Sequence, residues 1–172
     1  MEQQTLLLVD DEPSLLKGLQ RALRQESYRI LTAESGPKAL AILKEQNVQL
    51  VVSDYKMLKM DGLTLLKRIR ESYPHIVLIM LTGYADMGVL LQAINEVGMF
   101  KFFLKPISID QFRLAINAAL KLVEAREPGS VPSSDNIKKI LITELEHQYP
   151  GITNLPPRDD EGYYIIASES DS

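Results

Sequence analysis

Residues 50–62 read LVVSDYKMLKMDG, and this stretch contains the clearest indication of the fold. Its apolar run ends in a single carboxylate, Asp54, and then passes into a loop that ends at Gly62. Such a run is typical of a buried parallel strand that presents its last residue at the edge of a sheet. Ligands of open α/β sheets bind beyond the carboxyl ends of the strands, so Asp54 is a candidate site residue. The alternative role, a cap for the helix that starts near Gly62, suits Asp61 better.

Five apolar segments with strand patterns alternate with five segments of helical spacing. The predicted strands cover residues 5–9, 28–33, 48–53, 76–81 and 99–104. The predicted helices start near residues 13, 36, 62, 86 and 110; the first runs to about Glu26, and Asp86 caps the fourth. This alternation requires right-handed crossovers and a parallel sheet with helices on both faces.

Composition limits the class of protein. The chain has 172 residues, of which 45% are hydrophobic, so it can bury the core of one domain with an appendage, or of two very small domains. It contains no cysteine and two histidines, which excludes disulfides and argues against a thiolate or histidine metal centre. We expect a cytoplasmic protein without membrane insertion, because no apolar run approaches the roughly 20 residues that span a bilayer and no secretory signal is recognisable.

Charge is distributed unevenly along the chain. Residues 1–126 hold 16 Lys and Arg against 14 Asp and Glu (+2), and residues 127–172 hold 3 against 9 (−6), which together give the net charge of −4. Nucleic-acid binding needs clustered basic residues, so we expect no nucleic-acid partner. The segment around Lys138 and Lys139 is too short and too acidic for a DNA recognition helix.

Charged and polar side chains follow four of the predicted strands, at the same edge of the predicted sheet. They are Asp10, Asp11, Asp54, Thr82 and Lys105. The adjacent acids alone fit either a solvated turn or a site for a hard divalent cation. Taken together, the residues suit phosphoryl transfer to a carboxylate, with Asp54 as nucleophile, Asp10 and Asp11 bringing Mg²⁺, and Lys105 and Thr82 contacting the transferred oxygens.

Five blocks of the sequence, in order, resemble the signature of the receiver domain of two-component response regulators. The blocks are VDDEP at 9–13, SDYKM at 53–57, MDG at 60–62, LTG at 81–83, and Phe102 followed by Lys105-Pro106. The resemblance covers residues 5 to about 125. It implies a flavodoxin-like (βα)5 doubly wound parallel sheet with strand order 2-1-3-4-5.

The resemblance also implies the chemistry of the site. Asp54 would be phosphorylated by a cognate histidine kinase or phosphotransfer protein. Mg²⁺, or Mn²⁺ in its place, would be held by Asp11, Asp54 and the backbone carbonyl of Lys56, with Asp10 acting through water. The chain would then be a phospho-acceptor of a signalling phosphorelay rather than an enzyme, capable at most of catalysing its own phosphorylation and dephosphorylation.

Thr82 and Phe102 are the switch pair that the resemblance implies. In receiver domains the hydroxyl moves towards the phosphoryl group and the aromatic side chain turns inward. This change remodels the face made by the fourth helix, the fifth strand and the fifth helix, where a downstream protein or a second copy of the chain would bind. Without the motifs around them, the two residues would fit a buried strand-end hydroxyl and a core aromatic.

The sequence predicts a division of the chain into a receiver domain at 1–126, a linker at 127–136 and a short extension at 137–167. The extension begins with an amphipathic helix to about Gln148 and continues as a candidate β-hairpin over 152–167, and residues 168–172 are expected to be disordered. About 35 ordered residues bury little core alone, so we expect the extension to pack on the receiver, a second copy or a partner.

Two other functions fit the same sequence. One is a phosphorylation-independent scaffold, in which the extension keeps the receiver face bound. The other is a receiver fragment of a longer regulator such as a cyclic-di-GMP phosphodiesterase, because segments 81–86 and 93–96 are similar to receivers that are joined to such domains or that carry short tails. With two histidines, the chain itself lacks the metal ligands of a phosphodiesterase.

Overall fold

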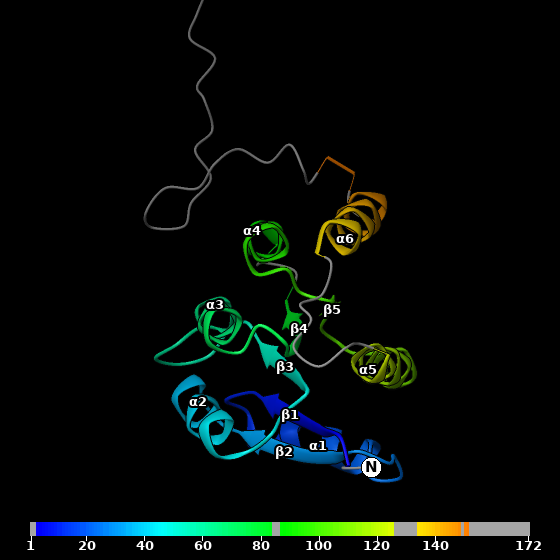
Figure 1. Cartoon of the computed structure of the whole chain (residues 1–172). Coiled ribbons are helices and arrows are strands. Elements are labelled where there is room, and N and C mark those ends of the chain that lie inside the picture. Colours follow the sequence, from blue (N-terminus) through cyan, green and yellow to red (C-terminus); the bar gives the residue numbers. More distant parts are fainter. Residues whose placement is uncertain (1–2, 84–86, 126–133, 149, 152–172) are drawn as a thin grey trace, which may run out of the picture.

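A computed structural model of the chain describes residues 3–83, 87–125, 134–148 and 150–151. Its strands are β1 (Thr5–Val9), β2 (Arg29–Ala33), β3 (Leu50–Asp54), β4 (Val77–Thr82) and β5 (Lys101–Leu104). Its helices are α1 (Pro13–Ala22), α2 (Gly36–Glu45), α3 (Gly62–Ser72), α4 (Met87–Val97), α5 (Ile109–Glu124) and α6 (Ser134–Gln148). Figure 1 shows the strands as one twisted sheet surrounded by helices.

All neighbouring strands run parallel, and their order is β2-β1-β3-β4-β5. This confirms the predicted flavodoxin-like sheet. Every residue of β1, β3 and β4 is buried, as the uniformly apolar strands predict, whereas β2 and β5 form the partly exposed edges. The register places Val9 beside Ser53 and Asp54 beside Leu81, so the carboxyl ends of β1, β3 and β4 meet at one edge.

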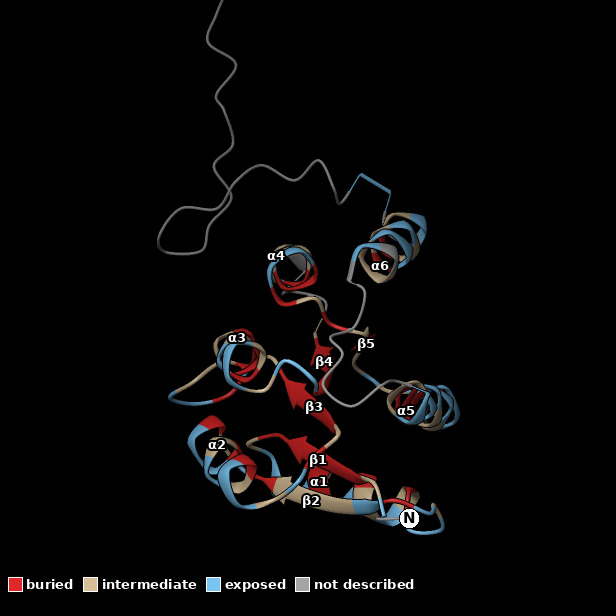
Figure 2. Cartoon of the chain, viewed as in Figure 1, coloured by how far each residue is buried: buried red, intermediate tan, exposed pale blue. Residues whose placement is uncertain are grey.

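Side chains of each strand alternate between two hydrophobic cores, one on each face of the sheet. Leu6 and Leu8 face the core under α1 and α5, whereas Leu7 and Val9 face the core under α2, α3 and α4. Figure 2 shows the buried residues concentrated on the strands and on the inward sides of the helices.

Local signals in the sequence account for most of the helix boundaries. Ser35 caps α2 by accepting a hydrogen bond from the backbone N–H of Lys38, and Asp61 caps α3 by accepting one from that of Thr64. The prediction that the first helix continues to Glu26 is wrong, because α1 ends at Ala22. There the N–H of Leu23 turns back to the carbonyls of the last helical turn, and the chain then turns towards β2. The predicted cap Asp86 lies outside the described residues.

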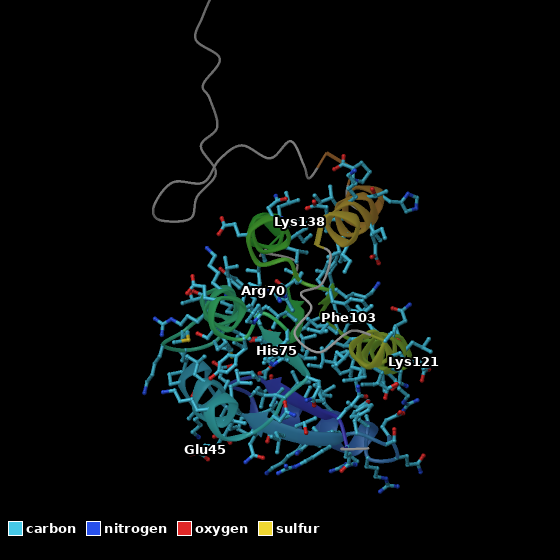
Figure 3. All side chains as sticks on the ribbon, in the orientation of Figure 1. Glu45, Arg70, His75, Phe103, Lys121 and Lys138 are labelled. Carbon is cyan, nitrogen blue, oxygen red and sulfur yellow. The ribbon has the colours of Figure 1, made fainter. Side chains whose placement is uncertain are left out.

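Arg70 ties α3 to the end of α4 (Figure 3). Its guanidinium donates hydrogen bonds to the carbonyls of Val97 at 2.9 Å and Gly98 at 3.1 Å. The first carbonyl belongs to the last residue of α4 and the second to the residue that follows it, at the end of the helix where the final acceptors have no partner within the helix. The bonds therefore fix the C-terminal end of α4 against its neighbour.

The helix α6 packs beside α4, next to the edge strand β5 (Figure 1). Leu141 and Leu145 are buried and belong to the same core as α2, α3 and α4. The helix was predicted from its apolar stripe, and it begins at Ser134, within the stretch predicted as linker. The candidate hairpin at 152–167 and the terminal residues 168–172 lie outside the described residues.

Candidate phospho-acceptor site

Three carboxylates converge at the carboxyl edge of the sheet. Asp10 follows β1, Asp11 comes next to it, and Asp54 is the last residue of β3. One carboxylate oxygen of each lies within 4.8 Å of the others. Asp10 and Asp54 are buried, whereas Asp11 is partly exposed. The edge therefore concentrates negative charge where little water can screen it.

Lys105 supplies the opposing charge. Its Nζ lies 2.8 Å from Asp54 Oδ1 and 3.1 Å from Asp10 Oδ2. The residue follows β5, and its backbone N–H donates to the carbonyl of Thr82 at 2.9 Å, which extends the β4–β5 ladder to the site. One ammonium thus bridges two of the three carboxylates.

Backbone hydrogen bonds hold the loop that follows Asp54. The N–H of Tyr55 donates to the carbonyl of Leu81 at 2.8 Å, and that of Gly62 donates to the carbonyl of Tyr55 at 2.7 Å. A Cβ atom at Gly62 would collide with the backbone carbonyl of Asp54. Glycine is therefore required by the close approach of α3 to the end of β3.

Two of the acids are also oriented by backbone donors. The N–H of Glu12 donates to Asp10 Oδ1 at 2.9 Å, and the N–H of Leu58 donates to Asp11 Oδ2 at 3.0 Å. The second bond links the first acidic turn to the loop after Asp54. Sequence analysis did not identify Leu58 in this role, because a backbone N–H carries no residue-specific signal.

The environment shifts the ionisation of the two central groups. Burial raises the pKa of Asp54, and the charges of Asp10 and Asp11 add to this rise, while the hydrogen bond and charge of Lys105 oppose it without reversing it. Burial alone would lower the pKa of Lys105, but its hydrogen bonds to Asp54 and Asp10 outweigh that effect, and the pKa is raised. Lys105 therefore remains an ammonium at neutral pH.

The other predicted site residues have different surroundings. Thr82 is buried at the end of β4, and its hydroxyl donates to the carbonyl of Gly83 at 3.4 Å. Phe102 does not join the acids; its buried side chain belongs to the core shared with α4 and α6. The side chain of Lys56 is exposed in the loop after β3.

The donor set fits a hard divalent cation. Asp10, Asp11 and Asp54 present oxygen ligands, which Mg²⁺ and Mn²⁺ prefer, and no histidine or sulfur ligand stands among them. A cation there would also relieve the repulsion between the three carboxylates. Whether the carbonyl of Lys56 takes part stays a prediction.

Residues 6–117 match the family model described as the response regulator receiver domain. The chain belongs to this family. The match includes the four charged groups of the carboxyl edge and ends within α5, so α6 lies beyond it.

Several curated proteins share this region. The transcriptional regulatory protein GlrR of Escherichia coli K12 is 40% identical over 116 residues, which is 67% of this chain and 26% of that protein. The hydrogenase transcriptional regulatory protein HoxA of Cupriavidus necator is 37% identical over 121 residues, which is 68% of this chain and 25% of that protein. The chain therefore spans about a quarter of the length of these relatives.

Solved receiver structures have the same fold. A signal receiver domain of an HD domain-containing protein from Pseudomonas fluorescens Pf-5 superposes with a TM-score of 0.70 at 34% identity, over 73% of this chain and all of that one. A receiver domain from Clostridium thermocellum gives a TM-score of 0.66 at 30% identity, over 70% of this chain and 97% of that one. Within the described ranges, none of the helices combines the length and hydropathy that a bilayer crossing requires.

Proposed function

We propose that this receiver accepts a phosphoryl group on Asp54 from a histidine kinase or phosphotransfer protein. The observation that carries the proposal is the bridging position of Lys105, whose Nζ contacts both Asp54 and Asp10 at the edge where the three carboxylates meet. In a receiver domain, this arrangement joins a buried nucleophile to a fixed positive charge. Mg²⁺ held by Asp10, Asp11 and Asp54, with the Lys56 carbonyl, would neutralise charge on the transferring group.

The residues of the chain have separate tasks in the transfer. A carboxylate oxygen of Asp54 forms the new bond to phosphorus while the bond from phosphorus to the donor breaks, and the donor leaves with that electron pair. The Lys105 ammonium, already within 2.8 Å of Asp54, is placed to hold an oxygen of the transferring group. Phosphoryl transfer depends mainly on such positioning and electrostatic stabilisation, so few groups are needed.

Transfer then becomes a signal through Thr82 and Phe102. The buried hydroxyl of Thr82 ends β4, next to the strand that carries Asp54, and Phe102 pairs with Met80 of β4. Movement of Thr82 towards the phosphoryl group would make room for Phe102 to turn inward. We propose that the α4, β5 and α5 face then changes its affinity for a downstream protein or a second copy. In this division, residues 1–126 receive the phosphoryl group and the segment beyond them contributes to the output.

The experiment is incubation of the full chain with acetyl phosphate, with and without Mg²⁺, followed by intact-mass spectrometry. One added phosphoryl group that requires both Mg²⁺ and Asp54 is expected. Asp54→Ala should take up none, whereas Asp110→Ala, which removes a carboxylate that is 90% exposed on α5, should behave like the unmodified chain. Absence of an adduct, together with absence of Mg²⁺ binding, would favour the phosphorylation-independent scaffold.

A further inference from the structure

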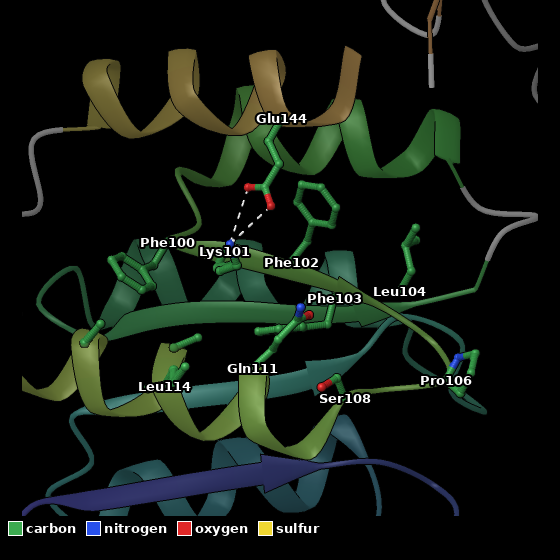
Figure 4. A pocket seen from close by; sticks show the side chains of 12 residues that line it. Phe100, Lys101, Phe102, Phe103, Leu104, Pro106, Ser108, Gln111, Leu114 and Glu144 are labelled. Carbon is green, nitrogen blue, oxygen red and sulfur yellow. Dashed lines mark hydrogen bonds and ion pairs between the residues drawn. The ribbon is translucent and has the colours of Figure 1, made fainter. Parts of the chain in front are cut away.

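The helix α6 covers the α4 side of the face through which a receiver of this kind would signal. It packs on α4 beside β5, whereas α5 lies on the other side of the same strand. Between α5 and α6 runs a groove of about 660 Å³, lined among others by Phe103, Leu114 and Glu144 (Figure 4). A protein that needs the whole face would therefore have to displace α6.

Two kinds of contact hold α6 in place. Leu141 and Leu145, one turn apart, are 2% and 0% exposed, and both belong to the core cluster that contains Leu90 and Ile94 of α4. Glu144 forms an ion pair with Lys101 of β5, with Nζ 3.3 Å from Oε1. Ile140 of the same helix is 64% exposed. Ile137 and Ile142 also pack against this cluster, so one apolar face of α6 makes the contacts.

Phe102 connects the surface under α6 to the phospho-acceptor site. It belongs to the same buried cluster as Leu141 and Leu145, and in Figure 4 its ring points from β5 towards α6, beside Glu144. An inward turn of this ring would remove apolar surface from beneath α6. The bound helix and the inward ring thus favour different arrangements of β5.

We propose that α6 is a displaceable intramolecular ligand of the α4–β5 surface, and that phosphorylation of Asp54 weakens its docking. This inference rests on the proposed function, since it uses the turn of Phe102 as the link. A partner that replaces α6 has to present an amphipathic helix with the same pattern, two leucines one turn apart and an acidic residue facing Lys101. Leu141, Glu144 and Leu145 define that pattern as Leu-x-x-Glu-Leu.

Coupling of this kind acts in both directions. If phosphorylation weakens the docking of α6, then docked α6 must oppose phosphorylation by the same factor. Undocking α6 by mutation should therefore favour uptake of the phosphoryl group. The two directions can be measured separately on the full chain.

The first measurement is hydrogen exchange of residues 134–148 by mass spectrometry, with and without acetyl phosphate and Mg²⁺. We expect exchange in α6 to become about fivefold faster or more in the phosphorylated chain. An adduct on Asp54 with unchanged or slower exchange in α6 would overturn the inference and leave the proposed function standing. If intact-mass spectrometry of the same sample shows no adduct, the proposed function and the coupling both fail.

The second measurement is the extent of phosphorylation of two variants. Leu145→Ala removes a buried contact and should raise the phosphorylated fraction at limiting acetyl phosphate, whereas the matched control Ile140→Ala should match the unmodified chain. Should Leu145→Ala not fold, Glu144→Lys, which places two ammonium groups together, should act in the same direction. Equal or lower phosphorylation of the folded variants would contradict the coupling.

The third measurement tests the surface itself. A fluorescent peptide of residues 134–148 should bind the unphosphorylated Leu145→Ala chain about fivefold or more tightly than the unphosphorylated unmodified chain, because docked α6 competes with it in the latter, and phosphorylation of the variant should weaken this binding. A peptide in which Leu141 and Leu145 are both replaced by alanine should not bind. Equal binding of the two peptides, or no binding of either, would overturn the assignment of a helix-binding surface.

Discussion

The carboxyl edge of the sheet is formed by charged side chains, whereas the edge covered by α6 is formed mainly by apolar ones. At the carboxyl edge, Asp10, Asp11 and Asp54 crowd together, and one ammonium, that of Lys105, bridges two of them. At the α6 edge, apolar side chains bury one another and the ion pair of Lys101 with Glu144 lies at their margin. The first region places charges where ionisation is costly, whereas the second gains stability from burial.

In the proposed function the two regions have different tasks: the carboxyl edge takes up the phosphoryl group, and the α6 edge responds to it. A site that binds a phosphoryl group needs uncompensated charge, and the raised pKa of Asp54 shows that the fold holds this charge at a cost. A surface that reports the event needs contacts that can be exchanged for others, and we propose that the docked face of α6, with Leu141 and Leu145, supplies them. Of the two residues that we propose as the switch pair, Phe102 belongs to the α6 edge.

The largest effect on stability is expected from Gly62→Ala, because this substitution displaces the backbone at the carboxyl edge. The new Cβ would meet the carbonyl of Asp54, so α3 and the end of β3 must separate, and we expect a loss of about 3 kcal/mol or more of unfolding free energy. The matched control is Gly18→Ala in α1, where nothing lies within 4 Å of the added Cβ. That variant should gain about 1 kcal/mol from helix propensity. Urea unfolding of both variants gives the measurement, and equal stabilities would refute the close approach.

Asp54→Asn tests the cost of charge at the same edge. Because the folded state raises the pKa of Asp54, the folded chain holds its proton to a higher pH than the unfolded chain does. Stability therefore falls as pH rises from the ordinary carboxyl range through the raised value. The neutral amide avoids this loss, so the variant should unfold at a higher temperature than the unmodified chain at pH 7 without Mg²⁺.

The thermal shift from Asp54→Asn should shrink as the pH falls below the ordinary carboxyl range, where Asp54 is neutral in both states. The measurement is thermal unfolding from about pH 3 to about pH 8, a range that covers the titration of the Asp54 carboxyl group. Asp110→Asn is the control, since its carboxylate is 90% exposed. A variant less stable than the unmodified chain at pH 7 would mean that the contact with Lys105 outweighs burial and repulsion.

Much of the carboxyl edge could be predicted from the sequence, because the patterns that indicate it are local. The central strands β1, β3 and β4 are mainly apolar runs that end at or just before a polar residue, so Asp10, Asp54 and Thr82 could be assigned to one edge once the strands were predicted to be parallel. The cap at Asp61 was equally local.

The surface on which α6 packs could not be predicted in the same way. The stripe of Leu141 and Leu145 shows that the helix has an apolar face, but it does not say which surface receives it. The link from Leu58 to Asp11 was hidden as well, because it uses a backbone group. The early end of α1 at Ala22 depends on how the chain turns towards β2 and not on the helical spacing of its residues.

The smallest effect is expected at the α6 edge, from the ion pair between Lys101 and Glu144. Both side chains are about one-third exposed, and Lys101 also lies over the ring of Phe103, 5.9 Å from its centre. A double-mutant cycle with Lys101→Gln and Glu144→Gln should give a coupling of about 0.2–1 kcal/mol that weakens as salt is added. Lys38 of α2 and Glu34, an exposed pair at the opposite edge of the sheet, provide the matched cycle. A coupling at Lys101 several times larger than that of this control would mean that charge, and not the burial of Leu141 and Leu145, holds α6 on its surface.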